Sequence, residues 1–145
     1  QSPLRALVQG PGAAWRVNSV VFRRELARSS ALTEGLQRYL RVVLTQMASS
    51  AACLRFHQIQ PRLARWLLMS ADRAHGPHFH VTHEFLAAML GVRRVGITMA
   101  ASALQRSGFI TYQRGEVTVT DRLGLEGAAC SCYARERLAY TAALG

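Results

Sequence analysis

Arginine is the residue type with the clearest chemical potential in this sequence. The 145 residues include 18 basic side chains, all of them arginine, against 8 acidic ones, which gives a formal net charge of +10. A guanidinium group is a planar fork that can donate two parallel hydrogen bonds to a phosphate or to the edge of a base. The charge predicts a polyanionic partner, and the 50% hydrophobic content predicts one or two small folded domains.

Histidines and cysteines are the candidate metal ligands. One loop-like segment carries a cluster of them, namely His75, His78, His80 and His83 with Glu84. However, Gly76-Pro77 is typical of a loop, and Ala87 stands where a helical zinc-protease motif needs its second histidine. The set Cys53, Cys130 and Cys132 has no fixed metal-binding spacing, and small buried residues are the better interpretation than a redox or metal role. We therefore expect no metal site and no cofactor.

The sequence lacks the motifs of an enzyme and of an exported or membrane protein. We find neither a strand-turn-helix elbow carrying a nucleophile nor a glycine-rich phosphate loop, so we expect no enzymatic activity. Three cysteines are too few and too unevenly placed for a disulfide framework, which favours a reducing cytoplasm. No signal peptide and no apolar run of about 18 residues is present, so no membrane partner is expected.

The elements that would position the arginines lie between residues 81 and 108. Thr82 is a good N-cap for a helix over 83–90, and a second helical pattern runs over 93–107. Ala87 in the first helix is small enough to let the two helices cross closely, and Gly91 allows a left-handed turn between them. Ile97 in the second helix can fill the space where the two helices meet. Together these three positions predict a helix-turn-helix.

After Gly108 the pattern changes to the alternation of strands. Residues 109–112 and 117–120 are rich in β-formers, with a turn over 113–116 that carries Arg114. This predicts a wing, and a winged helix-turn-helix with a basic wing is a DNA-binding module whose second helix enters the major groove. The candidate DNA-binding residues are Arg93, Arg94, Val95, Thr98, Met99, Ser102 and Arg114.

These candidates have different expected roles. Arg94 could donate two hydrogen bonds to guanine, and Val95 could contact a thymine methyl group. Arg93 and Arg114 suit phosphates, whereas Thr98 and Ser102 suit phosphates or base edges. The alternative is a protein-binding winged helix, in which Val95 and Met99 form an apolar docking surface.

A long amphipathic helix precedes this module. Apolar residues recur at helical spacing over 32–54, and the stripe has no evident cover within the chain, which predicts a homodimer through this helix. Packing of the helix on a missing domain is the alternative, and a C-terminal helix over 128–144 is the fallback interface. A further helix should begin near Pro61, with Arg62, Arg65 and Arg73 pointing outward.

The N-terminal segment predicts two short strands, over 4–9 and 14–17, around a Gly-Pro-Gly turn. Two strands alone make no stable domain, so they should belong to a larger sheet. Because the chain begins with Gln1 rather than methionine, we expect it to be a fragment or an ordered remnant of a longer protein. The expected fold is mainly α with a small β-wing, in which a long dimerisation helix precedes a winged helix-turn-helix.

Three segments, 62–68, 86–94 and 121–126, resemble the C-terminal part of a Crp/Fnr-type transcription regulator. The resemblance runs from about residue 4 to 134 and implies three regions: a β-roll sensor remnant over 1–28, a dimerisation helix over 29–57, and a winged helix-turn-helix with a C-terminal helix over 58–145. It implies a sequence-specific regulator that reads an inverted repeat in double-stranded DNA, with RNA polymerase as a further partner.

Two departures from the family limit what the resemblance implies. Arg94 matches the first base-reading arginine of well-studied members, but Val95 and Met99 replace a glutamate and a second arginine. The operator sequence therefore cannot be transferred. The phosphate-binding cassette of the sensor domain is not found in these residues, so we expect no cyclic-nucleotide binding.

Overall fold

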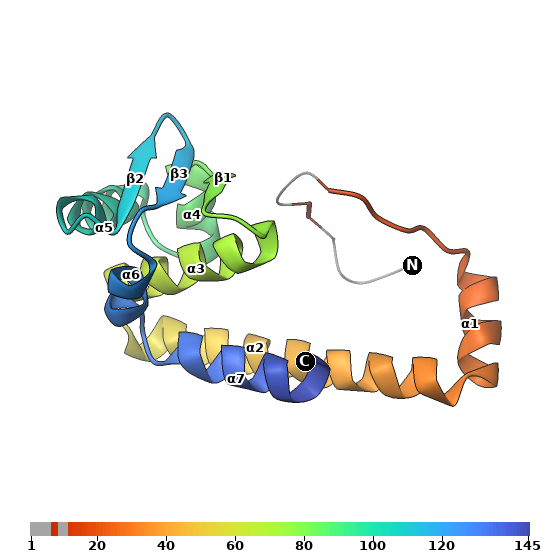
Figure 1. Ribbon diagram of the computed structural model, residues 1–145. Coiled ribbons are helices and arrows are strands. Elements are labelled where there is room, and N and C mark those ends of the chain that lie inside the picture. Colours follow the sequence, from red (N-terminus) through yellow and green to blue (C-terminus); the bar gives the residue numbers. More distant parts are fainter. Residues whose placement is uncertain (1–6, 9–11) are drawn as a thin grey trace.

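The computed structural model describes residues 7–8 and 12–145. Its elements in chain order are α1 (Ser19–Arg28), α2 (Ser30–Phe56), α3 (Ile59–Ala74), β1 (His78–His80), α4 (His83–Leu90), α5 (Arg94–Arg106), β2 (Ile110–Gln113), β3 (Glu116–Val119), α6 (Arg122–Ala128) and α7 (Cys132–Leu144). A long arm formed by α2 and α7 supports a compact unit made of α3 to α6 and a small sheet at its edge (Figure 1). The expected mainly α fold with a small β-wing is confirmed.

The chain enters the arm through two helices joined at Ser29. The side chain of Asn18 caps α1 by accepting a hydrogen bond from the Val20 amide at 2.8 Å. Ser29 ends α1 and caps α2, where its Oγ accepts from the Leu32 amide at 3.2 Å. The predicted helix over 32–54 is confirmed and extends to 27 residues, a length of about 40 Å.

The N-terminal strand prediction is wrong where the structure tests it. Residues 12–18 form no strand, and α1 follows directly. Within residues 7–8 and 12–145 no strand pairs with this segment, and an isolated strand pair is marginal in water. The predicted strand over 4–9 lies mostly outside the described residues.

Helix α3 forms the centre of the compact unit. It packs against α4, α5, α6, α7 and the sheet strands β1 and β3. Leu63, Ala64, Leu67 and Leu68 have no exposed surface, and they share one core with Leu86, Ile97, Leu104, Ile110 and Leu125 from the surrounding elements. The helix begins two residues before Pro61, so the proline lies within its first turn, where its missing N–H costs no hydrogen bond.

Two arginines of α3 correct the sequence prediction, because Arg62 and Arg65 are buried rather than outward. Arg62 Nη2 donates to the carbonyl of Leu90 at the end of α4. Arg65 Nη2 donates to Glu136 Oε1 of α7 at 2.5 Å and to Ser50 Oγ of α2 at 3.0 Å. Each guanidinium thus connects α3 to a neighbouring helix, and only Arg73 is exposed as expected.

The sheet has the strand order β1-β3-β2, and both pairs are antiparallel. Ile110 pairs with Val119 and Gln113 with Glu116, so β2 and β3 form the predicted hairpin, shifted by one residue. Strand β1 was expected to be loop and pairs with β3 through Phe79 and Val117. Its three residues become a strand only because β3 offers a free edge.

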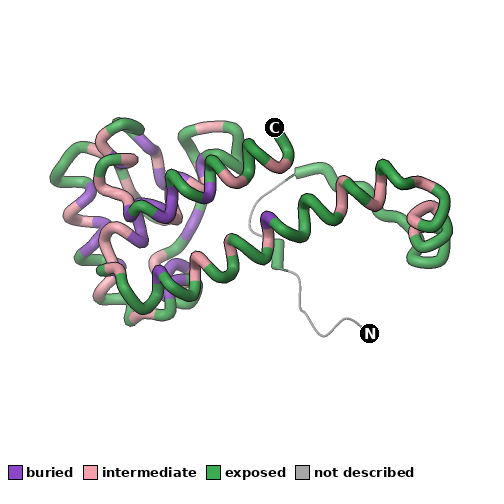
Figure 2. The backbone as a smooth tube through the Cα atoms, turned by 90° about the horizontal axis from the view of Figure 1, so that it is seen from below, coloured by how far each residue is buried: buried purple, intermediate pink, exposed green. Residues whose placement is uncertain are grey.

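The C-terminal helix α7 runs antiparallel along the second half of α2, beside it in both views (Figures 1 and 2). The first half of α2 is mostly exposed (Figure 2). Val42 and Cys53 are buried on the face of α2 that is covered. Helix α7 covers this face, whereas the predicted apolar stripe lies on another face of α2, where Leu40, Met47 and Leu54 remain more than half exposed.

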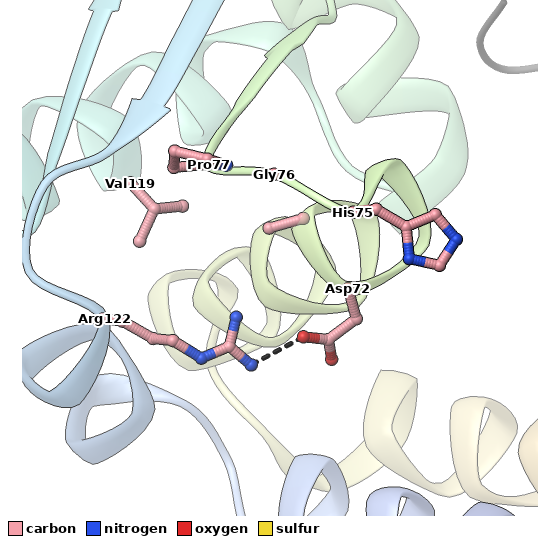
Figure 3. Close-up of a pocket in the computed structure, with 7 residues that line it drawn as sticks. Asp72, His75, Gly76, Pro77, Val119 and Arg122 are labelled. Atoms are coloured by element: carbon pink, nitrogen blue, oxygen red, sulfur yellow. Dashed lines mark hydrogen bonds and ion pairs between the residues drawn. The ribbon is translucent and has the colours of Figure 1, made fainter.

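The base of α7 is fastened to α3 by a polar cluster. Arg122 Nη2 donates to Asp72 Oδ1 at 2.5 Å and to the Tyr133 hydroxyl at 2.7 Å, and this hydroxyl donates to Asp72 Oδ2 at 3.0 Å. Figure 3 shows the Asp72–Arg122 pair at one side of an open pocket whose other side is formed by Pro77 and Val119. The contacts hold α6 and α7 against the end of α3.

Candidate nucleic-acid interface

Helices α4 and α5 form the predicted helix-turn-helix. Thr82 caps α4 by accepting from the Phe85 amide at 3.1 Å, as predicted. The two helices are bent by 108° relative to one another. This angle lies within the range of about 90–120° that is typical of the motif.

The turn between the helices follows from Gly91. Its φ of 59° is left-handed, and it ends α4 with two hydrogen bonds, from the Gly91 amide to Ala88 O at 3.3 Å and from the Val92 amide to Ala87 O at 3.0 Å. This is a Schellman motif, for which glycine is the preferred residue. Arg62 reaches the same helix end and donates to the Leu90 carbonyl, so α3 fixes the start of the turn.

The three positions that predicted the motif have the expected packing. Ala87 and Ile97 are both buried in the main core, and Ile97 has no exposed surface. Ala100, Ala101 and Leu104 continue the buried face of α5. The core therefore fixes the inward face of α5, and the opposite face of the helix is turned to solvent.

The outward face of α5 carries most of the candidate DNA-binding residues. Arg94 and Thr98 are exposed, as are Val95 at 63% and Met99 at 69%, while Ser102 is half-buried. Arg93 is exposed and occupies the N-cap position, where its side chain makes no capping hydrogen bond. Arg93, Arg94, Val95, Thr98 and Met99 thus lie together on the exposed face of the N-terminal half of α5. Ser102 lies one turn further along and is partly covered.

His83 belongs to this site although it was not among the predicted residues. Its Nδ1 and the hydroxyl of Thr98 share a hydrogen bond at 3.1 Å, and its ring meets the Tyr112 ring edge-on with centroids 4.5 Å apart. Burial and, second, the positive charge of Arg94 lower the pKa of His83 below its ordinary value. His83 therefore connects the first helix, the second helix and the wing as a neutral imidazole.

Tyr112 attaches the wing to the helices. Its hydroxyl donates to the carbonyl of Val81 at 2.6 Å, and its amide donates to Gln105 Oε1 of α5 at 2.8 Å. Burial raises the pKa of the Tyr112 phenol to about 12, so it remains a donor at neutral pH.

Arg114 lies at the tip of the wing. The two residues between the paired Gln113 and Glu116 are Arg114 with a φ of 51° and Gly115 with a φ of 88°. Two consecutive positive φ angles define a two-residue type I′ hairpin turn. The β2–β3 hairpin projects beyond the helices with its base beside α5 (Figure 1), so the exposed Arg114 is carried away from the core.

None of the helices in the described ranges, 7–8 and 12–145, is by itself long and apolar enough to cross a membrane. Only α4 and α5 taken together reach the necessary length and composition, and they are bent at the turn.

Comparison with known proteins identifies relatives of this architecture. Residues 61–128 match the family model of the Crp-like helix-turn-helix domain. A protein assigned to the Crp/Fnr family of transcriptional regulators from Eubacterium rectale has a similar structure, with a TM-score of 0.57 and 20% sequence identity over 76% of this chain and 51% of that chain. A CRP-family transcriptional regulator from Thermus thermophilus gives a TM-score of 0.54 and 26% identity over 80% of this chain and 58% of the other.

The catabolite activator protein of Thermus thermophilus is 27% identical over 76% of this chain and 50% of its own, with a TM-score of 0.46. The chain thus spans between half and three fifths of the length of these structures. It matches none of the curated proteins with which it was compared. The resemblance to Crp/Fnr-type regulators and the expected fold class are confirmed.

Proposed function

Because residues 61–128 match the family model of the Crp-like helix-turn-helix domain, we propose that this chain is a Crp/Fnr-type transcription regulator that binds double-stranded DNA as a dimer and reads an inverted repeat. The observation that carries the proposal is the free face of α5, with Arg94, Val95, Thr98 and Met99 outward on a helix whose other face is fixed in the core. The recognition helix 93–107 would lie in the major groove. A regulator of this kind would act in the cytoplasm, with RNA polymerase as a further partner.

Base reading would begin with Arg94. It stands in the first turn of α5, the part of a recognition helix that contacts base edges. Its guanidinium can pair with both major-groove acceptors of a guanine, while Val95 offers an apolar contact for a thymine methyl group. Thr98 and Met99 lie one turn further along the same face and would meet neighbouring bases.

Phosphate contacts would flank the recognition helix. Arg93 precedes α5 and Arg114 projects from the wing, so the two guanidinium groups come from different elements around the expected groove. Contacts of this kind position the protein and make its affinity depend on salt, but they carry no sequence information directly.

The dimer would form through the face of α2 that α7 leaves open. Leu40, Leu44 and Met47 share that face at helical spacing and are each more than half exposed. A two-fold dimer would present its two recognition helices to half-sites about 34–36 Å apart, one turn of DNA. An inverted repeat with that spacing follows from the symmetry.

Selection from random DNA duplexes tests the proposal directly. We expect enrichment of an inverted repeat whose half-sites lie about one helical turn apart. Enrichment of single-stranded DNA or RNA in a parallel selection, or no enrichment of any sequence, would contradict it.

Two arginine variants should separate base reading from phosphate contact. Arg94→Ala should cost about 1–3 kcal/mol on the selected site and relax the preference at one position in each half-site. Arg114→Ala should weaken all sequences alike and reduce the salt slope by about one unit per bound arginine. Quantitative binding assays over a salt series measure both effects.

If Arg94→Ala instead lowered specific and non-specific affinity by the same factor, Arg94 would be a phosphate contact. Base reading would then have to come from Val95, Thr98, Met99 or DNA shape.

A second candidate function is a protein-binding winged helix, which the exposure of Val95 at 63% and Met99 at 69% favours. Apolar docking and phosphate binding respond differently to salt. Affinity for DNA should fall steeply between low and moderate salt, whereas docking through Val95 and Met99 should not.

A further inference from the structure

The three cysteines of the chain and one histidine meet at a single point. Cys53 lies in the last turn of α2, His57 is the C-cap of α2, Cys130 lies in the link between α6 and α7, and Cys132 is the first residue of α7. Their ligand atoms, three sulfurs and one ring nitrogen, all lie within 4.8 Å of one another. The cysteines are buried and His57 is half-buried.

The spacing of these atoms suits one small cation. Tetrahedral zinc with bonds to sulfur of about 2.3 Å holds its ligand atoms about 3.8 Å apart. Here Cys53 Sγ and Cys130 Sγ are 3.5 Å apart, and Cys132 Sγ and His57 Nδ1 are 3.8 Å apart. An iron–sulfur cluster needs a wider arrangement, because its protein ligands bind different iron atoms.

From this geometry we propose that Cys53, His57, Cys130 and Cys132 bind one Zn²⁺ ion in a structural site. Three thiolates and an imidazole form one of the common ligand sets of structural zinc. Four protein ligands complete a tetrahedral shell, and soft sulfur ligands without a carboxylate select against magnesium and calcium.

Nearby side chains would support the bound ion. Three thiolates and one Zn²⁺ carry a net charge of −1, and Arg135 Nη2 donates to Cys132 Sγ at 3.8 Å. Burial raises the pKa of the Cys130 thiol to about 12, but a coordinating thiol loses its proton to the metal. Zinc uptake would therefore release protons.

Along the chain, two of the ligands lie before the helix-turn-helix domain and two lie after it. His57 precedes residues 61–128 and Cys130 follows them, so the ion would join the two segments that leave this domain. It would hold the start of α7 on the end of α2 and fix the domain at the base of the long arm. This role is independent of the proposed DNA binding.

Metal content and cobalt substitution test the proposal on the full chain. Chain purified under reducing conditions should contain one zinc per polypeptide by elemental analysis. Replacement by Co²⁺ should give sulfur-to-cobalt charge-transfer bands and the intense visible bands of a tetrahedral site. Removal of the metal by a chelator should lower the unfolding temperature, and added Zn²⁺ should restore it.

A variant and a matched control make the assignment specific. His57→Gln replaces the least buried ligand and should lower zinc affinity by more than the roughly 10–100-fold that is typical of losing an outer-shell partner. Ser131→Ala changes the exposed residue between two ligands and should leave one zinc bound.

Three results would overturn the zinc proposal. The first is a wild-type chain that carries no zinc and takes up neither Zn²⁺ nor Co²⁺. The second is iron and acid-labile sulfide in place of zinc. The third is a Cys53–Cys130 disulfide in chain kept under reducing conditions.

Discussion

His83 has the most informative environment of any single residue in the candidate interface. It touches Thr98 of α5 and Tyr112 of the wing, and it lies near the charge of Arg94. Protonation would place a second positive charge beside Arg94 at a half-buried position. The connection between the helices and the wing should therefore weaken in acid.

The shifted pKa of His83 predicts how stability depends on pH. Burial, and then Arg94, place the folded-state pKa below the unfolded value of 6.5. Between these two pKa values the unfolded chain binds more protons, so the free energy of unfolding should fall as pH falls through this window. In urea unfolding over a pH series, His83→Gln should make this dependence shallower by less than one proton.

An unchanged slope in His83→Gln would show that His83 titrates alike in both states.

Side-chain burial in α3 illustrates what the sequence could not reveal at this scale. Helical spacing puts Leu63 and Leu67 on one face of α3, and both are buried in the core, because one apolar face is enough to orient a helix. The same reasoning placed Arg62 and Arg65 outward. Their acceptors, Leu90 and Glu136, are 28 and 71 residues away, and no local pattern encodes such partners.

At the scale of elements, the junction of α2, α3 and α7 depends on one buried ion pair. Arg65 of α3 and Glu136 of α7 have side chains exposed by only 7% and 4%. Removing one partner of a buried pair leaves an uncompensated charge. We expect Glu136→Ala to cost about 3–5 kcal/mol of unfolding free energy, measured by urea denaturation.

Glu126→Ala is the appropriate comparison for that variant. Glu126 accepts hydrogen bonds from Arg122 and Arg137 nearer the surface, where ion pairs contribute about 0–1 kcal/mol. Equal losses in the two variants would mean that burial of the Arg65–Glu136 pair has no special weight.

Some elements could be predicted from residues close together in the sequence, whereas others are stabilised by residues far away in the sequence. Ala87, Gly91 and Ile97 predicted the helix-turn-helix because the motif is encoded within about twenty residues. Strand β1 was missed because its three residues are stabilised by β3, which lies almost forty residues away. Helix α1 was not predicted, although it begins at a local signal, the N-cap Asn18.

The candidate site follows the same division. The outward residues of α5 could be predicted from the helical period alone, and Arg114 from the hairpin pattern. His83 could not, because its role depends on the fold of the wing over α4. The convergence of Cys53, His57, Cys130 and Cys132 also depends on tertiary structure, which brings α7 back onto α2.

At the scale of the whole molecule, the open face of α2 predicts a dimer. Leu40→Glu combined with Leu44→Glu places two charges on that face and should convert dimers into monomers. Sedimentation velocity over a concentration series measures the change.

Arg38→Gln combined with Thr45→Glu alters the net charge by the same amount at exposed positions on the other side of α2 and should leave the dimer intact. A dimer that survives the leucine substitutions would place the interface elsewhere.

The start of α5 has a thermodynamic consequence for DNA binding. Arg93 occupies the N-cap position without capping the helix, and the first amides of any helix lack acceptors within it. A DNA phosphate is an acceptor that such a helix end favours. The DNA phosphate would then accept hydrogen bonds from the first amides of α5. Part of the binding free energy would therefore stabilise the first turn of this helix. We expect hydrogen exchange of the Arg94 and Val95 amides to slow on specific DNA, while the amides of the Ile97–Leu104 core face change little.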